Sequence, residues 1–263
     1  MIRSAAEDVL LVDMGNSRTK WAVCGNEDAF GTPFRMTGVI DNTELPAFAP
    51  ASWRTCRRAL VASVASSAMT ASMEALLQAL SIPVYRPQAE ASAGGLINGY
   101  ADPKQLGVDR WLAAIAAWRH FRSTCAVVSA GTALTVDAIA GSGDGEPGRF
   151  LGGFIVPGLQ LMQRSLRHGA AGIHAINGLE RAFPDNTGDA MYSGAIAAMT
   201  GAVHHMLRQL ERRENTLPRC ILSGGDAPLL AQALATRDDV HVEMCVVDNL
   251  VLQGLQLIES ECS

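Results

Sequence analysis

The feature that most limits how this chain can fold is a short internal repeat. Residues 10–23 (LLVDMGNSRTKWAV) and residues 126–139 (AVVSAGTALTVDAI) share one pattern: an apolar run, a polar residue, a spacer, glycine, a small polar residue and a second apolar run. Gly15 aligns with Gly131, at an offset close to half of the 263-residue chain. Apolar runs joined by a glycine turn are typical of β-hairpins. The repeat therefore predicts two related halves, each of which opens with a strand, a glycine turn and a second strand.

Predicted strands and helices alternate along the rest of the chain, which is typical of an α/β fold. Apolar runs predict strands at 9–13, 20–24, 60–64, 84–85, 126–128, 134–140, 150–156, 219–222 and 240–247. Helical spacing of apolar residues predicts helices at 67–80, 108–121, 157–167, 188–213, 228–236 and 248–260. The glycine-rich stretch 91–103 predicts no regular element. At this length we expect two domains, residues 1–120 and residues 121–263, although the last helix could also pack back onto the first domain.

Composition excludes several classes of protein. The formal net charge of −5, from 21 basic and 26 acidic residues, argues against nucleic-acid binding, because phosphate backbones attract Lys/Arg-rich surfaces. No apolar run reaches the roughly 18 residues of a membrane span. Glu7 and Asp8 interrupt the position where a signal peptide is apolar. The six cysteines form no C-x-x-C pair, so we expect reduced thiols in a cytoplasmic protein.

The turn of the first hairpin, D-M-G-N-S-R-T-K at 13–20, has the composition of a phosphate-binding loop. Glycine lets backbone N–H groups approach a phosphate because no Cβ stands in the way. Asn16 and Ser17 add hydrogen-bond donors, Lys20 adds a positive charge, and Asp13 offers oxygen ligands to Mg²⁺. An ordinary hairpin turn has the same composition, so this loop alone leaves both interpretations open.

Two further glycine turns follow predicted strands in the second half. Gly131 and Thr132 offer backbone amides and a hydroxyl, while Gly224 and Gly225 could let an adenine ring lie against the backbone. A plain turn explains each of them equally well. A phosphate-binding turn in each half nevertheless favours a nucleotide held between the two halves.

The segment Y-A-D-P-K-Q-L-G-V-D-R-W at 100–111 contains the strongest catalytic candidates. Asp109 and Arg110 are adjacent at the start of a predicted helix. Asp109 could act as a general base towards a substrate hydroxyl, and Arg110 could bind a substrate carboxylate. An acidic residue also stabilises the N-terminus of any helix, so simple capping explains Asp109 as well.

Together these motifs resemble those of the type III pantothenate kinases of bacteria, and the resemblance covers nearly the whole chain. The segments that carry it are D-M-G-N-S-R-T-K (13–20), L-G-V-D-R-W (106–111), G-T-A-L-T-V-D (131–137), G-G-F-I-V-P-G-L (152–159) and N-T-G-D-A (186–190). The L-G-V-D-R-W block and the first loop, in this order and at this spacing, are specific to that family.

The resemblance implies the duplicated ribonuclease-H-like architecture of the actin and sugar-kinase superfamily, with ATP bound in a cleft between two domains. It implies a transferase that converts ATP and pantothenate into ADP and 4′-phosphopantothenate, the first step of coenzyme A biosynthesis. It also implies Mg²⁺ as a cofactor and a homodimer whose active site lies near the interface.

The same resemblance assigns roles to individual residues, with Asp109 as the proton acceptor. The ATP phosphates and Mg²⁺ are expected at Asp13, Met14, Gly15, Asn16, Ser17, Arg18, Thr19 and Lys20, with Asp13 as the Mg²⁺ ligand. The rest of ATP is expected at Gly131, Thr132, Gly224 and Gly225. Pantothenate is expected to contact Tyr100, Gly107, Val108, Asp109 and Arg110, and also Thr187 across a dimer interface.

Ser129 departs from the family pattern. Many members have aspartate at this position, where the carboxylate helps to bind an activating monovalent cation such as potassium or ammonium. A neutral serine is a weaker ligand for a cation, although backbone carbonyls could complete such a site. We therefore expect weak binding of a monovalent cation here.

Other functions are compatible with parts of the sequence. One is a kinase of the same superfamily that acts on another small hydroxy acid or sugar, and a second is a regulator that keeps the fold without catalysis. The retained Asp109, Arg110 and first loop argue against the regulator. Direct DNA binding has the least support, given the negative net charge.

Lysine is scarce, because only Lys20 and Lys104 occur among the 21 basic residues. Lysine is a compact point charge on a flexible stem, whereas arginine presents a planar fork. Lys20 closes the first loop, where a mobile charge can follow a moving phosphoryl group. Lys104 is expected to be a solvated loop residue.

Overall fold

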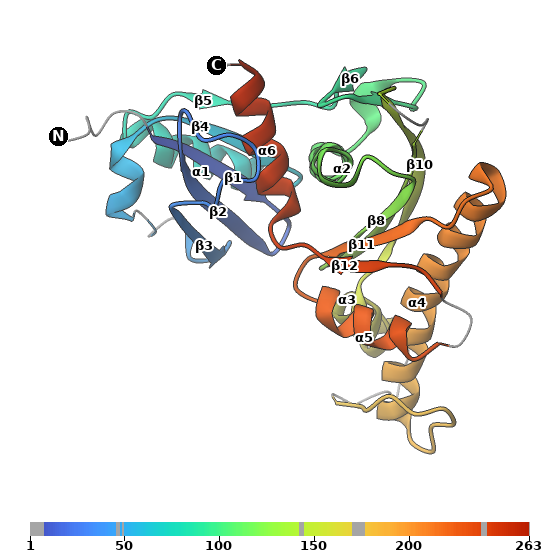
Figure 1. Ribbon diagram of the computed structural model, residues 1–263. Coiled ribbons are helices and arrows are strands. Elements are labelled where there is room, and N and C mark those ends of the chain that lie inside the picture. Colours follow the sequence, from blue (N-terminus) through green and yellow to red (C-terminus); the bar gives the residue numbers. More distant parts are fainter. Residues whose placement is uncertain are drawn as a thin grey trace. The chain divides into compact units, whose positions relative to one another are not determined.

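The computed structural model describes residues 8–45, 48, 50–141, 145–169, 177–237 and 241–262. The chain divides into two compact units (Figure 1). The first unit comprises Met1–His120 together with Asn249–Ser263, and the second comprises Phe121–Asp248. None of the described helices is long and apolar enough to cross a membrane.

The first unit contains a five-stranded mixed sheet with the order β3-β2-β1-β4-β5. Its strands are β1 (Asp8–Met14), β2 (Arg18–Gly25), β3 (Met36–Asp41), β4 (Cys56–Ser63) and β5 (Val84–Tyr85). β2 is antiparallel to both β1 and β3, whereas β4 is parallel to both β1 and β5. Helix α1 (Ser67–Ala79) makes the crossover from β4 to β5.

Alternation along β1 assigns the two faces of this sheet. Leu10, Val12 and Met14 are fully buried in a core that includes Met73 of α1. Burial of each such side chain contributes roughly 1.5–3 kcal/mol. Because successive strand residues point to opposite faces, Asp13 is directed away from this core.

The C-terminal helix α6 (Leu250–Cys262) packs on the first unit, where it contacts β1, β2 and β4. Its Glu259 is buried and accepts hydrogen bonds from Arg57 at 3.1 Å and from Arg58 at 3.0 Å, both on β4. The expected second domain, residues 121–263, included this helix. The structure places it with the first unit because its buried face and Glu259 have their partners there.

The second unit repeats the strand order of the first, as β10-β9-β8-β11-β12. Its strands are β8 (Cys125–Ala130), β9 (Ala133–Ala140), β10 (Gly148–Pro157), β11 (Arg219–Ser223) and β12 (Met244–Val246). Its helices are α3 (Leu159–Gly169), α4 (Thr187–Glu214) and α5 (Ala227–Ala235). The pairing directions are also the same, and α5 makes the crossover from β11 to β12. The expected pair of related ribonuclease-H-like halves is therefore confirmed.

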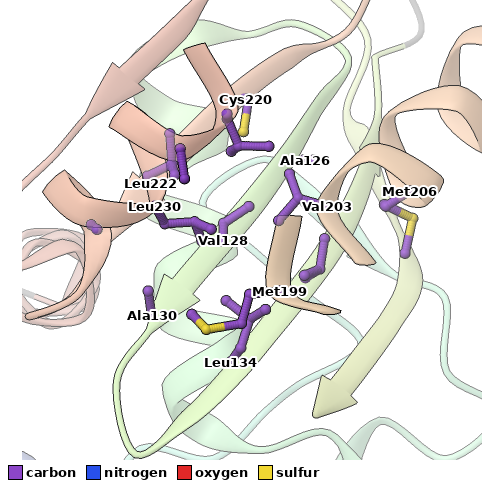
Figure 2. Packing of buried hydrophobic residues seen from close by; sticks show 14 of the residues in the cluster. Ala126, Val128, Ala130, Leu134, Met199, Val203, Met206, Cys220, Leu222 and Leu230 are labelled. Carbon is purple, nitrogen blue, oxygen red and sulfur yellow. The ribbon is translucent and has the colours of Figure 1, made fainter. Parts of the chain in front are cut away.

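One face of the second sheet packs against α4 and α5. Ala126 and Val128 of β8 lie in one buried cluster with Met199 and Val203 of α4 (Figure 2). Alternation along β8 then places Ser129 on the opposite face.

Some elements differ from those that the sequence predicts. The segment 91–103 contains the short antiparallel strands β6 (Ser92–Ala93) and β7 (Leu96–Asn98) and the 3₁₀ turn η3 (Pro103–Gln105). A second 3₁₀ turn, η2, spans Ala51–Thr55. These elements and the mostly exposed β3 are too short or too polar to produce an apolar pattern. Helix α2 (Val108–Phe121) has the predicted bounds, and residue 240 of the predicted strand 240–247 lies outside the described residues.

Candidate functional site

The first glycine turn joins β1 to β2. The backbone N–H of Gly15 donates to the carbonyl oxygen of Arg18 at 3.0 Å, and a Cβ on Gly15 would lie 3.2 Å from that oxygen. Asn16, Ser17 and Arg18 are exposed, whereas the side chains of Met14 and Thr19 are fully buried. The turn therefore presents polar groups to solvent at its tip, and Met14 offers no side chain to a ligand.

Asp13 and Lys20 are register partners on β1 and β2, at the base of this turn. Burial raises the pKa of the Asp13 carboxyl from 3.8 to about 7, an effect that the charge of Asp109 reinforces and that of Lys20 opposes. The structure thus brings the first loop and the segment 100–111 close enough for their charges to interact.

A carboxylate in this setting fits a Mg²⁺ ligand. Mg²⁺ commonly takes one or two carboxylates and completes its shell with water and substrate phosphates. A bound cation would offset the repulsion between Asp13 and Asp109 and favour their ionised forms. The described residues contain no group of three or more Asp, Glu, His or Cys side chains that could hold a metal alone.

Asn42, which follows β3, contacts the first loop at three points. Its Nδ2 donates to the carbonyl oxygen of Gly15 at 2.8 Å, and its Oδ1 accepts from the hydroxyl of Thr19 at 2.8 Å. Its backbone N–H donates to the carbonyl oxygen of Ser17 at 3.1 Å. Sequence reasoning misses this residue, because D-N-T at 41–43 looks like a local turn and nothing in the pattern links it to the loop.

Asp109 lies in the first turn of α2, where the helix dipole favours a negative charge. Burial raises the pKa of its carboxyl, although the backbone N–H groups of Asp109 and Arg110 and the positive charge of Arg110 lower it. A Cβ on Gly107 would lie 2.7 Å from Asp109 Oδ1. The absence of a side chain at Gly107 therefore provides the space that the Asp109 carboxylate occupies. The neighbouring Val108 is partly buried.

Arg110 is buried, and its Nη1 donates to the phenolic oxygen of Tyr100 at 3.1 Å. Its guanidinium also lies 6.0 Å from the centre of the Tyr100 ring. Tyr100 is anchored by the buried Asn98, whose Oδ1 accepts from the backbone N–H of Tyr100 at 3.0 Å. Asn98 Nδ2 in turn donates to the carbonyl oxygen of Glu90 at 3.1 Å. The predicted pair Tyr100 and Arg110 is thus brought together and held in place.

Lys104 belongs to the short turn η3 and is exposed. The side chain of Asp102 caps that turn by accepting from the backbone N–H of Lys104 at 3.1 Å. Lys104 also lines a surface cavity of about 430 Å³, together with Arg86 and Glu90, and none of the predicted site residues lines this cavity. This placement fits the expectation of a solvated residue.

The two glycine turns of the second unit lie next to each other. A Cβ on Gly224, whose φ is +105°, would lie 2.2 Å from the carbonyl oxygen of Ala130. In the turn after Ala130, the N–H of Gly131 donates to the carbonyl oxygen of Ala133 at 3.0 Å, and Thr132 is exposed. The structure therefore brings Gly131, Thr132 and the Gly224 turn together where β8 and β11 end. A Cβ on Gly225 would meet no other atom within 4 Å.

The turn at Gly131 and Thr132 also requires glycine at position 158. A Cβ on Gly158 would lie 2.0 Å from the carbonyl oxygen of Gly131, and its N–H donates to the carbonyl oxygen of Thr132 at 3.0 Å. Any side chain at Gly158 would displace the second loop. The sequence contains the residue within a family motif but gives no sign of this contact.

Ser129 is part of a row of hydroxyl side chains. It is the register partner of Thr135 on β9 and of Ser223 on β11. Among the described atoms, Thr135 Oγ1 is buried without a hydrogen-bond partner. These oxygens are neutral, so they fit a monovalent cation only as weak ligands.

Thr187 is the exposed first residue of α4. Asn186 caps that helix by accepting from the N–H of Asp189 at 2.9 Å. Asp189 Oδ1 accepts from the N–H of Leu179 at 2.7 Å, and this bond together with one from Asn186 lowers the pKa of the Asp189 carboxyl. Thr187 lies in the second unit, as do the glycine turns at Gly131 and Gly224. The other predicted pantothenate residues lie in the first unit.

Comparison with known families gives one consistent result. The family model described as type III pantothenate kinase matches residues 9–209. A type III pantothenate kinase of Methylobacillus flagellatus is 45% identical over 251 residues, which cover 95% of this chain and 97% of that protein. One from Thiobacillus denitrificans is 43% identical over 249 residues, 95% of each chain.

A solved structure is similar over nearly the full length. It is a Baf family protein from Campylobacter jejuni, with a TM-score of 0.59 at 20% sequence identity, and the match covers 96% of this chain and 98% of that one. This similarity supports the fold of the whole chain.

Proposed function

Because the chain belongs to the type III pantothenate kinase family, which phosphorylates pantothenate with ATP in coenzyme A biosynthesis, we propose that Asp109 is its general base. The observation that carries this proposal is the position of the Asp109 carboxylate. It lies in the first turn of α2, next to the Arg110–Tyr100 pair and within electrostatic reach of Asp13. The Asp109 carboxylate is thus near both Arg110, which is proposed to bind the carboxylate of pantothenate, and the loop that is proposed to bind the phosphates of ATP.

The phosphates of ATP bind the first loop in this proposal. Backbone amides and the side chains of Asn16, Ser17 and Arg18 surround the phosphates, and Lys20 supplies a positive charge. Asp13 would hold Mg²⁺, which neutralises charge on the phosphoryl oxygens when it is bound. The turns at Gly131, Thr132, Gly224 and Gly225 of the second unit hold the rest of the nucleotide.

Pantothenate binds through its carboxylate to Arg110, whose position Tyr100 fixes. Gly107 and Val108 form the adjoining backbone, and Thr187 of a partner subunit contacts the substrate. Holding one end of the substrate converts binding energy into orientation of its primary hydroxyl.

The reaction then needs positioning and charge neutralisation more than covalent chemistry. The hydroxyl oxygen of pantothenate attacks the γ-phosphorus in line, and the bond to the β–γ bridging oxygen breaks. Asp109 accepts the hydroxyl proton, and ADP leaves. Lys20 follows the charge as it moves onto the bridging oxygen.

A coupled assay of ADP release, with pantothenate or other small hydroxy acids and sugars as acceptors, tests the function. We expect ATP-dependent turnover with pantothenate and Mg²⁺. Absence of turnover with pantothenate would favour a non-catalytic protein, and preference for another acceptor would favour a different kinase.

The same assay with potassium or ammonium tests the site at Ser129. Because the hydroxyl row is neutral, we expect weak activation of the natural protein. In Ser129→Asp we expect half-maximal activation at about tenfold lower potassium, since a carboxylate attracts the cation electrostatically. Equal potassium dependence of the two proteins would separate Ser129 from cation binding.

Substitution of the two lysines tests the phosphate loop. We expect Lys20→Ala to lower kcat/KM for ATP by about 10²-fold, the usual effect of removing one group that stabilises transition-state charge. Lys104→Ala is the matched control, expected to stay within about twofold because Lys104 lies on an exposed turn and lines a cavity that none of the predicted site residues lines. Similar losses in both variants would contradict the role of Lys20.

We also propose that the protein is a homodimer through its second unit. Large apolar side chains are exposed on α3 and on the segment before Thr187, including Leu166, Leu179 and Phe183, which is 94% exposed. Coverage of such exposed side chains by a partner subunit would remove their apolar area from water. Sedimentation analysis should give twice the chain mass, and a monomer would contradict the proposal.

The cellular location follows from the substrates in this proposal. ATP and the coenzyme A pathway are cytoplasmic, and the cysteines whose side chains the structure describes are free thiols, namely Cys24, Cys56, Cys125, Cys220 and Cys245. Fractionation of cells that express the protein tests this location.

A further inference from the structure

We infer that Asn42 is a positioning residue of the nucleotide site, which sets the direction of the peptide groups in the first loop. This inference rests on the proposal that the loop 13–20 binds the phosphates of ATP. Asn42 lies outside the loop, and its side chain is 4% exposed. The inference deepens the proposed function. It gives Asn42, a residue outside the family motif, the role of orienting the loop so that it can bind an anion.

The chemistry of the contacts requires an amide side chain. The carbonyl oxygen of Gly15 can only accept a hydrogen bond, so the group that faces it at 2.8 Å must be the NH₂ of Asn42. The Oδ1 of Asn42 is then left to accept from the Thr19 hydroxyl, also at 2.8 Å. Aspartate would place an acceptor against the Gly15 carbonyl, and leucine would leave both partners unsatisfied in a buried place.

These bonds fix the orientation of two peptide planes. Asn42 draws the carbonyl oxygens of Gly15 and Ser17 towards itself, through its side chain and its backbone N–H respectively. In a planar trans peptide, the N–H of the next residue points opposite to the carbonyl. The N–H groups of Asn16 and Arg18 therefore point away from Asn42, at the exposed tip of the loop. Outward N–H groups are what a phosphate-binding turn requires.

The turn that follows β3 holds Asn42 in position. Asp41 Oδ1 accepts from the backbone N–H of Thr43 at 3.0 Å and from its hydroxyl at 2.7 Å. The N–H of Glu44 donates to the carbonyl oxygen of Asp41 at 3.0 Å. Asp41 is also the register partner of Arg18 across β2 and β3. This turn at the end of β3 therefore carries Asn42 into the loop.

The test compares Asn42→Asp and Asn42→Ala with the natural protein. We expect KM for ATP to rise about tenfold or more, as expected for one or two lost buried hydrogen bonds, with KM for pantothenate within about twofold. Titration calorimetry with Mg·ADP should show a similar loss of affinity. This binding readout does not depend on turnover.

Asn98→Asp is the matched control, because Asn98 is also a buried asparagine of the first unit that makes two side-chain hydrogen bonds. It anchors Tyr100, so we expect its substitution to raise KM for pantothenate and leave Mg·ADP binding within about twofold. If the Asn42 variants lose mainly nucleotide affinity and Asn98→Asp loses mainly pantothenate affinity, Asn42 positions the nucleotide loop and Asn98 positions Tyr100. Circular dichroism and Tm identify any variant that loses its fold, and Asn42→Ser then provides a milder change at the same position.

Two outcomes would overturn the inference, and they are distinguishable. If the Asn42 variants fold with a lower Tm but bind Mg·ADP as tightly as the natural protein, Asn42 has only a structural role. If the natural protein itself binds no Mg·ADP, the proposed phosphate loop is wrong and the inference fails with it.

Discussion

Replacement of Asp109 by asparagine is expected to lower kcat for pantothenate phosphorylation by about 10²–10⁴-fold, the usual contribution of a general base. Asparagine has nearly the same size and can still accept the backbone N–H bonds at the start of α2. The fold should therefore persist, with Tm within a few degrees of the natural protein. Because the amide cannot accept the hydroxyl proton, the loss should appear in kcat more than in either KM.

The pH dependence gives a second readout for Asp109. Burial raises the pKa of this carboxyl, so protonation should remove the base at a higher pH than for an ordinary aspartate. We expect kcat in the natural protein to fall on the acid side of the profile through protonation of both Asp109 and Asp13. In Asp109→Asn only the contribution of Asp13 should remain, so the acid limb should change its midpoint or become less steep. Such a change distinguishes a base from a residue that merely caps the helix.

Asp102→Asn is the matched control for this substitution. Asp102 lies in the same segment, is exposed, and caps the short turn η3. We expect its kcat to stay within about twofold, because loss of an exposed cap affects stability slightly and reaches no reacting group. Near-natural kcat in Asp109→Asn, or equal losses in both variants, would remove Asp109 from the base role.

Features that depend on local sequence are predictable from the chain alone. The hairpins at Gly15 and Gly131 are examples, since a glycine turn between two apolar runs is decided by neighbouring residues. The position of Asp109 at the start of α2 is another, because helical spacing begins there. The repeat of these hairpins predicted the doubled architecture before any tertiary contact was known.

Features that depend on distant partners could not be predicted in this way. Helical spacing predicts α6, but only the burial of Glu259 beside β4 shows that this helix belongs to the first unit. Asn42 and Gly158 act on loops that are 20 or more residues away in sequence, through contacts of backbone carbonyls with an amide or with a missing Cβ. Such contacts leave no periodic signal in a single sequence.

Replacement of Asp13 by asparagine is expected to raise stability and to lower turnover by about 10²-fold or more. The folded chain holds the Asp13 proton up to about pH 7, whereas an unfolded chain releases it near pH 4. The natural protein therefore loses stability as pH rises from about 4 to 7, and the full loss, on the order of 2–4 kcal/mol, applies above pH 7. A neutral amide avoids most of this loss, so we expect Asp13→Asn to be more stable by about 1–3 kcal/mol at pH 8. The gain should shrink as the pH falls towards 4.

The matched control is Asp8→Asn, at the other end of β1. Asp8 forms an ion pair with Arg35, so its removal loses this pair and should not raise Tm. Activity should also be retained in this variant, because Asp8 lies away from the loop.

Addition of Mg·ADP should reverse the order of stability between the natural protein and Asp13→Asn. A ligand that binds only the folded state raises stability according to its concentration relative to Kd. The natural protein should gain Tm with Mg·ADP, since the cation favours the ionised carboxylate and offsets its cost. Asp13→Asn lacks that charge and should gain little, with turnover reduced by about 10²-fold or more. Equal Tm gains in the two proteins would place Mg²⁺ elsewhere. A lower Tm of Asp13→Asn without ligand at pH 8 would contradict the destabilising effect of the ionised Asp13 carboxylate. The Asp13 carboxylate therefore lowers the stability of the folded chain when it is ionised, and in this proposal the same ionised carboxylate holds Mg²⁺ beside the nucleotide.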